Sequence, residues 1–448
     1  MKRACIAFFA AASVVLLTFP SAPARAQSTD SKAKTQEELE QEIEELQRRL
    51  EILTTEVRKV KEAQTVPEKV DLKSQYGMGP AASKVYSKER GLSLGGYGEF
   101  NFKKEVADGD GNDVFDFVRF VGYVGYKFTD KLLFNTEIEL EHASTDKAGS
   151  VSLEFGYLDY AMHPKVSLRG GLLLIPVGFI NELHEPVTYH GNQRPEVERL
   201  IIPTTWRANG AGIYGELMPG LTYRTYAVTS MRAEGFRSGN IRGGRQKGSE
   251  ALANDWSFVG RLDYNPTPGL TFGASAYMGD QGQDQELYDR AAADPNDPDD
   301  PGTPIGTADA FMQMYEGHAQ WHWRGLEFRA LGVVSLLEDS RQLSLNASQP
   351  IAKRMVGWYT ELAYNVLPLM LPGTGQYLAP WARYSVYDTQ DKVPNGFDPR
   401  LNDNRSSIEV GIDYKPIPQV VLKVDYRNET AERGSRPDLV RIGGGFVF

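Results

Sequence analysis

The chain has 448 residues, of which 41% are hydrophobic, 11% aromatic and 24% charged, with one cysteine and a formal net charge of −10. This composition excludes disordered and collagen-like chains, and the mean hydropathy of −0.41 is too polar for a helical membrane protein. The acidic balance also speaks against nucleic acid as a partner.

Residues 1–26 have the parts of a secretory signal peptide. Lys2 and Arg3 precede an apolar stretch at 4–19, and small residues stand at Ala24 and Ala26. Cleavage after Ala26 would remove the one cysteine, so the mature chain would hold no disulfide. It would also remove three basic residues, which changes the formal net charge from −10 to −13. The sequence therefore predicts an acidic exported protein.

Residues 36–63 are predicted to form a short α-helical coiled coil. Apolar residues recur there at alternating spacings of four and three, and Glu, Gln, Arg and Lys fill nearly all the positions between them. The seam residues are Leu39, Ile43, Leu46, Leu50, Leu53, Val57 and Val60. Because so short a helix is marginal alone in water, we expect it to associate with other copies. The alternative is a solitary amphipathic helix on the surface of its own protein.

Pro67 ends the helix, and residues 64–90, with their Pro, Gly and Ser, are predicted to be a polar linker. From Leu92 onward the apolar period changes to two. In 132–142, for example, Leu132 and Ile138 share one face while Glu137 shares the other with further polar residues. Such a strand fits either a half-buried sheet or a wall between lipid and water.

Sixteen segments with this period follow one another, most of them near the 9 to 11 residues or so that cross a bilayer at a tilt. They are 92–102, 114–128, 131–143, 150–163, 166–177, 210–218, 221–231, 254–264, 269–279, 310–323, 326–337, 353–365, 377–387, 405–415, 419–429 and 437–448. Their connections alternate between short turns and longer loops, as in bacterial outer-membrane barrels. We therefore predict an all-β fold in which a transmembrane antiparallel β-barrel at 91–448 follows the coiled coil.

The last strand carries Val440, Ile442, Gly444, Phe446 and Phe448 on one face and ends in an aromatic residue. With the export signal and the alternating strands, this resembles bacterial outer-membrane porins, and with the coiled coil it resembles the phosphate-selective porin O/P-like group. The resemblance implies that Phe446 and Phe448 are the signal read by the barrel assembly machinery. It further implies a homotrimer in outer-membrane lipid and lipopolysaccharide, with the N-terminal helix in the periplasm.

Sixteen strands enclose a water-filled lumen, so function depends on what narrows and charges it. In porins the third external loop folds inward, and here that loop is 179–210, with prolines and an apolar Leu200-Ile201-Ile202 that indicate a rigid loop. Its candidate constriction residues are Glu182, Glu185, Glu196, Glu198, Arg194 and Arg199. The alternative is an exposed loop that only covers the mouth. The loop contains no Lys, which departs from a phosphate-selective pore.

The alternation of the strands places a set of arginines on the lumen wall, because a cation that faced lipid near the midplane would cost about 2 to 4 kcal/mol. The candidates are Arg119, Arg169, Arg224, Arg261, Arg329, Arg383 and Arg441. They are interleaved with a slightly larger set of acids. The resemblance suggests a transverse field between these arginines and the acidic part of loop 179–210. Alternatively, the charges pair across strands and solvate a wide channel.

No catalytic constellation and no cofactor or metal site is expected. The six histidines are scattered, and His318 and His322 on one strand would lie about 13 Å apart, too far to share a metal. The acidic loop 280–309 either binds divalent cations or is simply solvated. We predict a weakly selective, cation-preferring porin for small hydrophilic solutes or ions rather than an enzyme. The alternative is a structural anchor or tether whose coiled coil is the working part.

Overall fold

The computed structural model describes residues 36–64, 72–107, 109, 111–146, 148–294, 297 and 299–448. The predicted signal peptide and its cleavage site lie outside these residues. The chain divides into two units, 1–69 and 70–448, and each is described by itself.

In the first unit, Gln36–Gln64 form the helix α1, so the expected helical segment is confirmed as a helix. Of its predicted seam, the side chains of Ile43, Leu46, Leu50 and Leu53 are all more than half exposed, whereas those of Leu39, Val57 and Val60 lie outside the described residues. Association into a coiled coil stays a prediction. Among the described helices, none combines the length and apolar character needed to cross a membrane.

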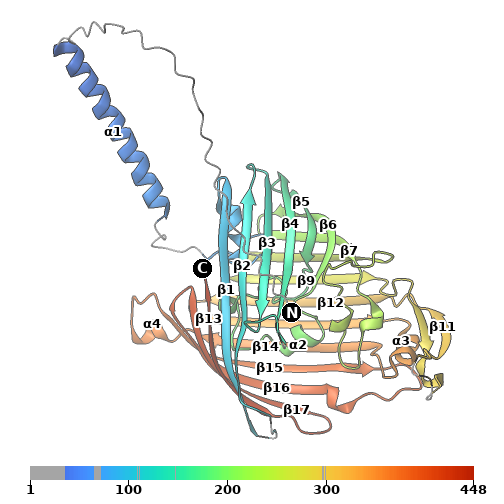
Figure 1. Cartoon of the computed structure of the whole chain (residues 1–448). Helices are drawn as coiled ribbons and strands as arrows, with labels where there is room; N and C mark the ends of the chain where they lie inside the picture. Colours follow the sequence, from blue (N-terminus) through green and yellow to red (C-terminus); the bar gives the residue numbers. More distant parts are fainter. Residues whose placement is uncertain are drawn as a thin grey trace, which may run out of the picture. The chain divides into compact units, whose positions relative to one another are not determined.

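The second unit is a closed antiparallel barrel of sixteen strands in which each strand pairs with its neighbours along the chain, and β1 pairs with β18 (Figure 1). The barrel strands are β1 Gly91–Ala107, β2 Val114–Lys127, β3 Leu132–Glu141, β4 Ser150–His163, β5 Val166–Leu174, β6 Arg207–Met218, β7 Leu221–Thr229, β8 Trp256–Thr267, β9 Leu270–Gly279, β12 Met312–Trp323, β13 Leu326–Leu337, β14 Arg354–Tyr364, β15 Tyr377–Lys392, β16 Asn404–Ile417, β17 Val420–Ala431 and β18 Asp438–Val447. All sixteen predicted strands are confirmed.

The two faces of the strands differ as the alternation predicts. Outward side chains such as Ile138, Leu262 and Ile412 are about half exposed, while the neighbouring inward side chains Glu137 and Asp413 are buried. An apolar outer face and a charged inner face are the pattern of a barrel wall between lipid and a polar lumen.

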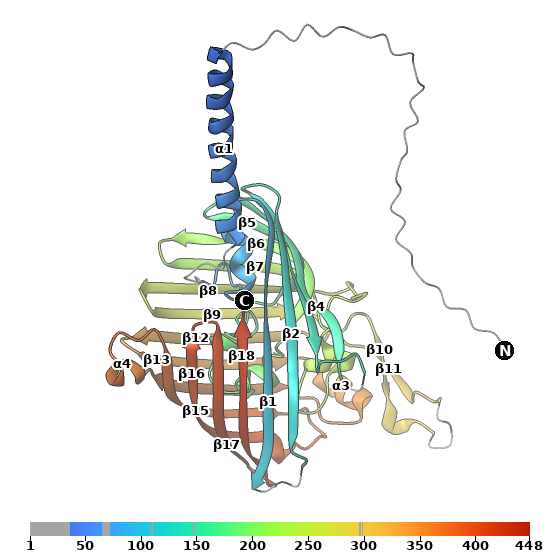
Figure 2. The same cartoon turned by 60° about the vertical axis from the view of Figure 1, so that its left-hand side comes forward.

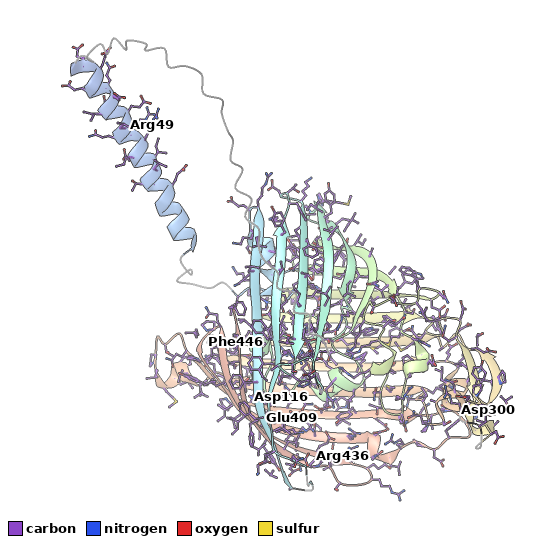
Figure 3. The ribbon with its side chains drawn as sticks, viewed as in Figure 1. Arg49, Asp116, Asp300, Glu409, Arg436 and Phe446 are labelled. Carbon is purple, nitrogen blue, oxygen red and sulfur yellow. The ribbon has the colours of Figure 1, made fainter. Side chains whose placement is uncertain are left out.

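The two ends of the barrel carry different connections. Figure 1 shows the small helix α4, Leu367–Met370, at the short-turn end of β13–β17, and the helix α3, Ser340–Ala347, at the long-loop end. The long-loop end also holds a hairpin of β10, Glu286–Asp289, and β11, Thr303–Thr307, which the sequence did not predict. Figure 3 places Asp300 of this acidic loop at that end, away from Phe446 on β18.

The C-terminus takes part in closing the barrel, as β18 beside β1 shows in Figure 2. The N–H of Phe448 donates to the carbonyl of Gly96 at 2.9 Å, and the N–H of Gly96 donates back to the carbonyl of Phe448 at 3.0 Å. A side chain at Gly96 would lie 2.6 Å from the Phe448 ring, so the glycine makes room for the terminal aromatic residue. The last residue is therefore part of the β1–β18 seam.

Residues 72–90, from the segment expected to be a linker, are folded against the inner wall of the barrel. They contain the 3-10 helix η1, Ala82–Ser87, and bury Met78, Ala81 and Val85 almost completely. The amide of Asn135 on β3 donates to the carbonyl of Ala82 at 3.0 Å. We call residues 72–90 the N-terminal segment. Its Pro, Gly and Ser residues are the reason why its sequence resembles a linker.

Candidate functional site

Residues 178–206 make up most of the connection between β5 and β6 and contact inward-facing side chains all round the barrel. We call them loop 178–206. On one side, Arg261 of β8 donates to the carbonyl of Gly178. On the other side, Lys423 of β17 donates to the carbonyl of Tyr189 at 2.8 Å. The loop therefore bonds to strands that are far apart around the wall.

The loop holds its own shape through buried polar groups. The amide of Asn181 donates to the carbonyls of Ile175 and Trp206 at 2.7 and 2.8 Å, and its oxygen accepts from the N–H of Trp206 at 2.6 Å. The short helix α2, Glu196–Leu200, follows later in the loop, and its Val197 packs with Ile201 in the buried core. These contacts make the loop a packed element, in line with its proline content.

Glycines on the inner face of the wall let the loop approach closely. A side chain at Gly357 on β14 would lie 2.8 Å from Cδ1 of Ile201, and one at Gly445 on β18 would lie 2.5 Å from Cβ of Pro186. Both distances are shorter than a real carbon contact. At these two positions the loop fits against the wall because the wall has no side chain there.

The four glutamates predicted to line a constriction are buried, with exposed fractions of 4% or less. Glu182 lies 3.3 Å from Nε of Arg224 and 3.8 Å from Nη1 of Arg261. Glu196 pairs with Arg199 and Arg427, both at 2.6 Å. Each of these carboxylates therefore binds protein groups.

The other two glutamates bind backbone N–H groups. Glu198 accepts from the N–H of Ile180 at 2.7 Å and from the hydroxyl of Tyr359 at 2.6 Å. Glu185 accepts from the N–H of Ala81 at 2.9 Å and from that of Ala82 at 3.2 Å. Glu185 thereby joins loop 178–206 to the N-terminal segment, which enters the barrel from the opposite end.

The predicted wall arginines face the lumen and pair mostly across neighbouring strands. The shortest pairs are Arg119 with Glu99 at 2.7 Å, Arg169 with Asp159 at 2.8 Å, Arg224 with Asp263 at 2.6 Å, Arg261 with Asp263 at 2.8 Å, Arg383 with Glu361 at 2.5 Å and Arg441 with Asp425 at 2.5 Å. Arg329 instead donates to the carbonyl of Thr188 in the loop at 3.2 Å. This arrangement corresponds to the cross-strand pairing that the sequence left as an alternative, with the loop covering the pairs.

Several contacts of this site were not predicted by the sequence analysis. His190 in the loop bonds to Asp413 of β16 at 2.8 Å, and the ring of His190 stacks on Trp381 of β15. Alternation places Asp413 and Trp381 on the inner wall, but no sequence pattern links them to a histidine more than 190 positions away. Their meeting depends on how the loop crosses the lumen.

A second group is a set of cations at the long-loop end, of which the sequence analysis named only Arg194. Arg242 and Arg245, in the connection between β7 and β8, donate to backbone carbonyls of loop 178–206, including that of Thr205 at 2.8 Å from Arg245. Burial, together with neighbouring arginines, lowers the pKa of Arg242 to about 9. Arg194 is 9% exposed, and its Nε and Nη2 have no hydrogen-bond partner within the described part of the chain. These three arginines form a basic cluster.

Two pockets open near the short-turn end. One, of about 540 Å³, is lined by residues that include Tyr76, Glu182, Arg224 and Asp263. The other, of about 370 Å³, is lined by residues that include His190, Glu327, Arg329 and Lys415. Leu183 lines both, so each pocket lies between the loop and one part of the wall. Charges of both signs line the water-accessible space.

One group in the described residues has the composition of a metal site. Glu137 of β3, Glu154 of β4 and His184 of the loop are all buried, and their ligand atoms lie within 4.8 Å of one another.

The chain is similar to an uncharacterized protein of Aquifex aeolicus (strain VF5), with 38% identity over 392 residues that cover 84% of each chain. No known family model matches the sequence. The structure of this chain resembles that of OmpTdeltaL8, a loop-deletion mutant of a Vibrio cholerae outer membrane protein. The TM-score is 0.52, with 9% identity and coverage of 81% of this chain and 100% of that one. It also resembles Salmonella typhi OmpF in a complex with daunomycin, with a TM-score of 0.51, 14% identity and coverage of 80% and 98%. The fold is therefore that of outer-membrane porins.

Proposed function

The chain belongs to the same family as the uncharacterized Aquifex aeolicus protein, and we propose that it is an outer-membrane channel through which small hydrophilic solutes or ions diffuse. The observation that carries the proposal is a closed sixteen-stranded wall with an apolar outer face and a charged inner face. A barrel that only anchors a protein needs fewer strands, since about eight can be filled by side chains alone.

Passage through this channel is proposed to be narrow. Loop 178–206 reaches inward from the long-loop end, the N-terminal segment reaches inward from the other end, and Glu185 joins them. The pockets of about 370 and 540 Å³ beside Leu183 are the spaces through which a solute would leave the lumen. We therefore expect a small conductance and only small solutes.

We propose weak charge selectivity, because the wall charges pair with one another across strands. Arg383, for example, contacts Glu361 at 2.5 Å, so these two charges offset each other. Weak selectivity also departs from a phosphate-selective pore.

The remaining proposals concern assembly. The helix α1 would lie in the periplasm and join copies into a homotrimer, and the barrel would sit in outer-membrane lipid with lipopolysaccharide. The barrel assembly machinery would read the last strand, where Phe446 and Phe448 stand. The packing of the Phe448 ring beside Phe446 and Phe120 supports a role for these aromatic residues at the β1–β18 seam.

Insertion of the purified full-length protein into a planar lipid bilayer tests the proposal. We expect discrete conductance steps and, in a salt gradient, a reversal potential near zero. The same preparation unfolded by heat serves as the control. A protein that is folded by its heat-dependent electrophoretic mobility and gives no conductance steps would contradict the channel.

One observation favours the anchor as a second candidate. The loop and the N-terminal segment fill much of the lumen from both ends, and wall charges such as Asp425 and Arg441 are almost completely buried. An anchor needs no open passage. Absence of conductance in a folded protein that still associates through α1 would support this reading.

A further inference from the structure

A buried position where β3, β4 and loop 178–206 meet holds more carboxylates than arginines. The carboxylate of Glu137 is fully buried, its Oε2 has no hydrogen-bond partner within the described part of the chain, and its one ion pair recorded there is with His184. Nearby, Glu154 pairs with Arg207 at 3.2 Å, and Glu139 shares Arg119 with Glu99. An uncompensated buried carboxylate is costly, so the site favours either a second proton on His184 or a further cation between Glu137 and Glu154.

The geometry of His184 suits a metal ligand. Its Nδ1 lies 3.2 Å from the carbonyl of Asn181, and this contact directs Nε2 toward the two carboxylates. A backbone carbonyl on the second ring nitrogen is the usual support for a metal-bound histidine. If Nδ1 carries the proton, a neutral imidazole points its Nε2 lone pair at two carboxylates, and only a cation or a second proton makes that arrangement favourable.

Two of the ligand separations fit one ion at the centre. Nε2 of His184 lies 3.2 Å from Oε1 of Glu137 and 3.3 Å from Oε2 of Glu154. Two ligand atoms bound tetrahedrally at about 2.0 to 2.2 Å from zinc are about 3.4 Å apart. Meanwhile Arg207 holds Oε1 of Glu154, which leaves Oε2 free for the ion.

We propose that His184 Nε2, Glu137 and Glu154 bind one divalent transition-metal ion of the Zn²⁺ class, which fastens loop 178–206 to β3 and β4. One nitrogen and two carboxylate oxygens are ligands that zinc accepts in proteins. The binding site itself does not depend on the proposed function. Its consequence does, because a fastened loop would keep the proposed channel narrow.

Metal content of the refolded full-length protein tests the site. Because the three side chains are almost completely buried, the protein is refolded in detergent with Zn²⁺ and then dialysed against metal-free buffer. Mass spectrometry should find about one zinc per chain in the wild type. The variants E137Q and H184Q should lose at least about 100-fold in zinc affinity. H163Q, which removes an exposed histidine of β4, is the matched control and should retain the zinc.

A second measurement needs no variant, so it holds even if H184Q does not fold. The Co²⁺-loaded wild type should show the visible absorption of a tetrahedral site with nitrogen and oxygen ligands. Refolded wild type without zinc, or with as much zinc as folded H184Q, would overturn the site and leave a doubly protonated His184 between the two glutamates. Conductance steps from zinc-free protein would support the proposed channel without the zinc site. Bound zinc in a protein without conductance would contradict the channel and not the zinc site.

Discussion

The carboxylate of Glu185 in loop 178–206 accepts a hydrogen bond from the N–H of Ala81 at 2.9 Å, across 104 positions of sequence. The same carboxylate also accepts from the next N–H, that of Ala82. Two elements that enter the barrel from opposite ends are thereby joined inside it. Removal of this contact is the most direct test of whether the two elements together narrow the lumen.

Glu185→Ala is expected to release the N-terminal segment. The change leaves two buried N–H groups without acceptors, which costs about 1–3 kcal/mol each. We expect single-channel conductance at neutral pH to increase while the barrel stays folded. Glu89→Ala, an exposed glutamate in the same segment, is the control and should leave conductance unchanged. Equal conductance in all three proteins would show that the segment does not restrict the passage.

The same contact predicts a pH dependence. Burial raises the pKa of Glu185 to about 7, even though the N–H groups of Ala81 and Ala82 favour its charged form. Because the docked state holds this proton more tightly than an undocked carboxyl with the ordinary pKa of about 4.3, docking strengthens as pH falls through 7 and weakens as pH rises.

Conductance should therefore fall between about pH 7 and pH 5. Lys84, His184 and Glu137 also face Glu185, and acid keeps Lys84 charged. Glu185→Gln, which is neutral at every pH, should abolish most of this dependence. A wild type and a Glu185→Gln variant with the same pH profile would assign the effect to another group.

Packing of the loop on β14 gives a third prediction. Gly357→Val places a side chain where Cδ1 of Ile201 and Cβ of Tyr387 leave no room, and overpacking of this kind costs about 1–3 kcal/mol. We expect a lower thermal unfolding midpoint and a noisier or larger conductance. Gly317→Val on β12 adds the same side chain at a position with open space around it, and should leave both unchanged. Equal midpoints would mean that the loop does not rest on Gly357.

The sixteen strands could be predicted from sequence because a wall between lipid and a polar interior imposes the same alternation on every strand. Trp256, Phe258 and Leu262 of β8 face outward, as their spacing indicates. The β10–β11 hairpin could not be predicted, because its strands have only four and five residues and lie in an acidic, proline-rich loop.

The contacts inside the lumen were harder to predict from the sequence. The length and prolines of 179–210 indicated a special loop, and its packed interior agrees. The partners of its glutamates could not be predicted, because Ala81, Arg427 and Tyr359 lie more than 100 positions away and present no pattern of their own. Local periodicity determines which face a side chain occupies, whereas the pairing across the lumen depends on the path of the loop.

Oligomerisation through α1 gives a fourth prediction. Leu46 and Leu50 are 59% and 69% exposed in the single chain, and burial of such residues between helices is the expected driving force for association. Leu46→Asp or Leu50→Asp should shift the oligomer to monomer in native electrophoresis while the barrel stays folded. Gln47→Asp changes a neighbouring position off the seam and should leave the oligomer intact. An unchanged oligomer in both leucine variants would show that the helix does not form the interface between copies.

The last prediction concerns ion selectivity, where two sets of charges must be weighed. Glu182 and Glu185 are among the constriction residues expected from the sequence. In the structure, however, the charge of Glu182 is compensated by Arg224 and Arg261, and Glu185 is bound to backbone N–H groups. Removing a compensated charge changes the local potential less than removing a cation that faces other cations.

Arg242 and Arg245 are such cations, since the hydrogen bonds that they donate within the described residues go to backbone carbonyls. They lie at the long-loop end, where we propose that ions enter, and neighbouring arginines act on both through their charge. Such interactions extend over about one Debye length, which is about 8 Å at physiological salt. The double variant Arg242→Gln with Arg245→Gln should therefore move the reversal potential in a salt gradient toward cations. Glu182→Gln with Glu185→Gln should produce a smaller shift, toward anions. If the glutamate pair produced the larger shift, the constriction proposed at Glu182 and Glu185 would set selectivity and the basic cluster would not.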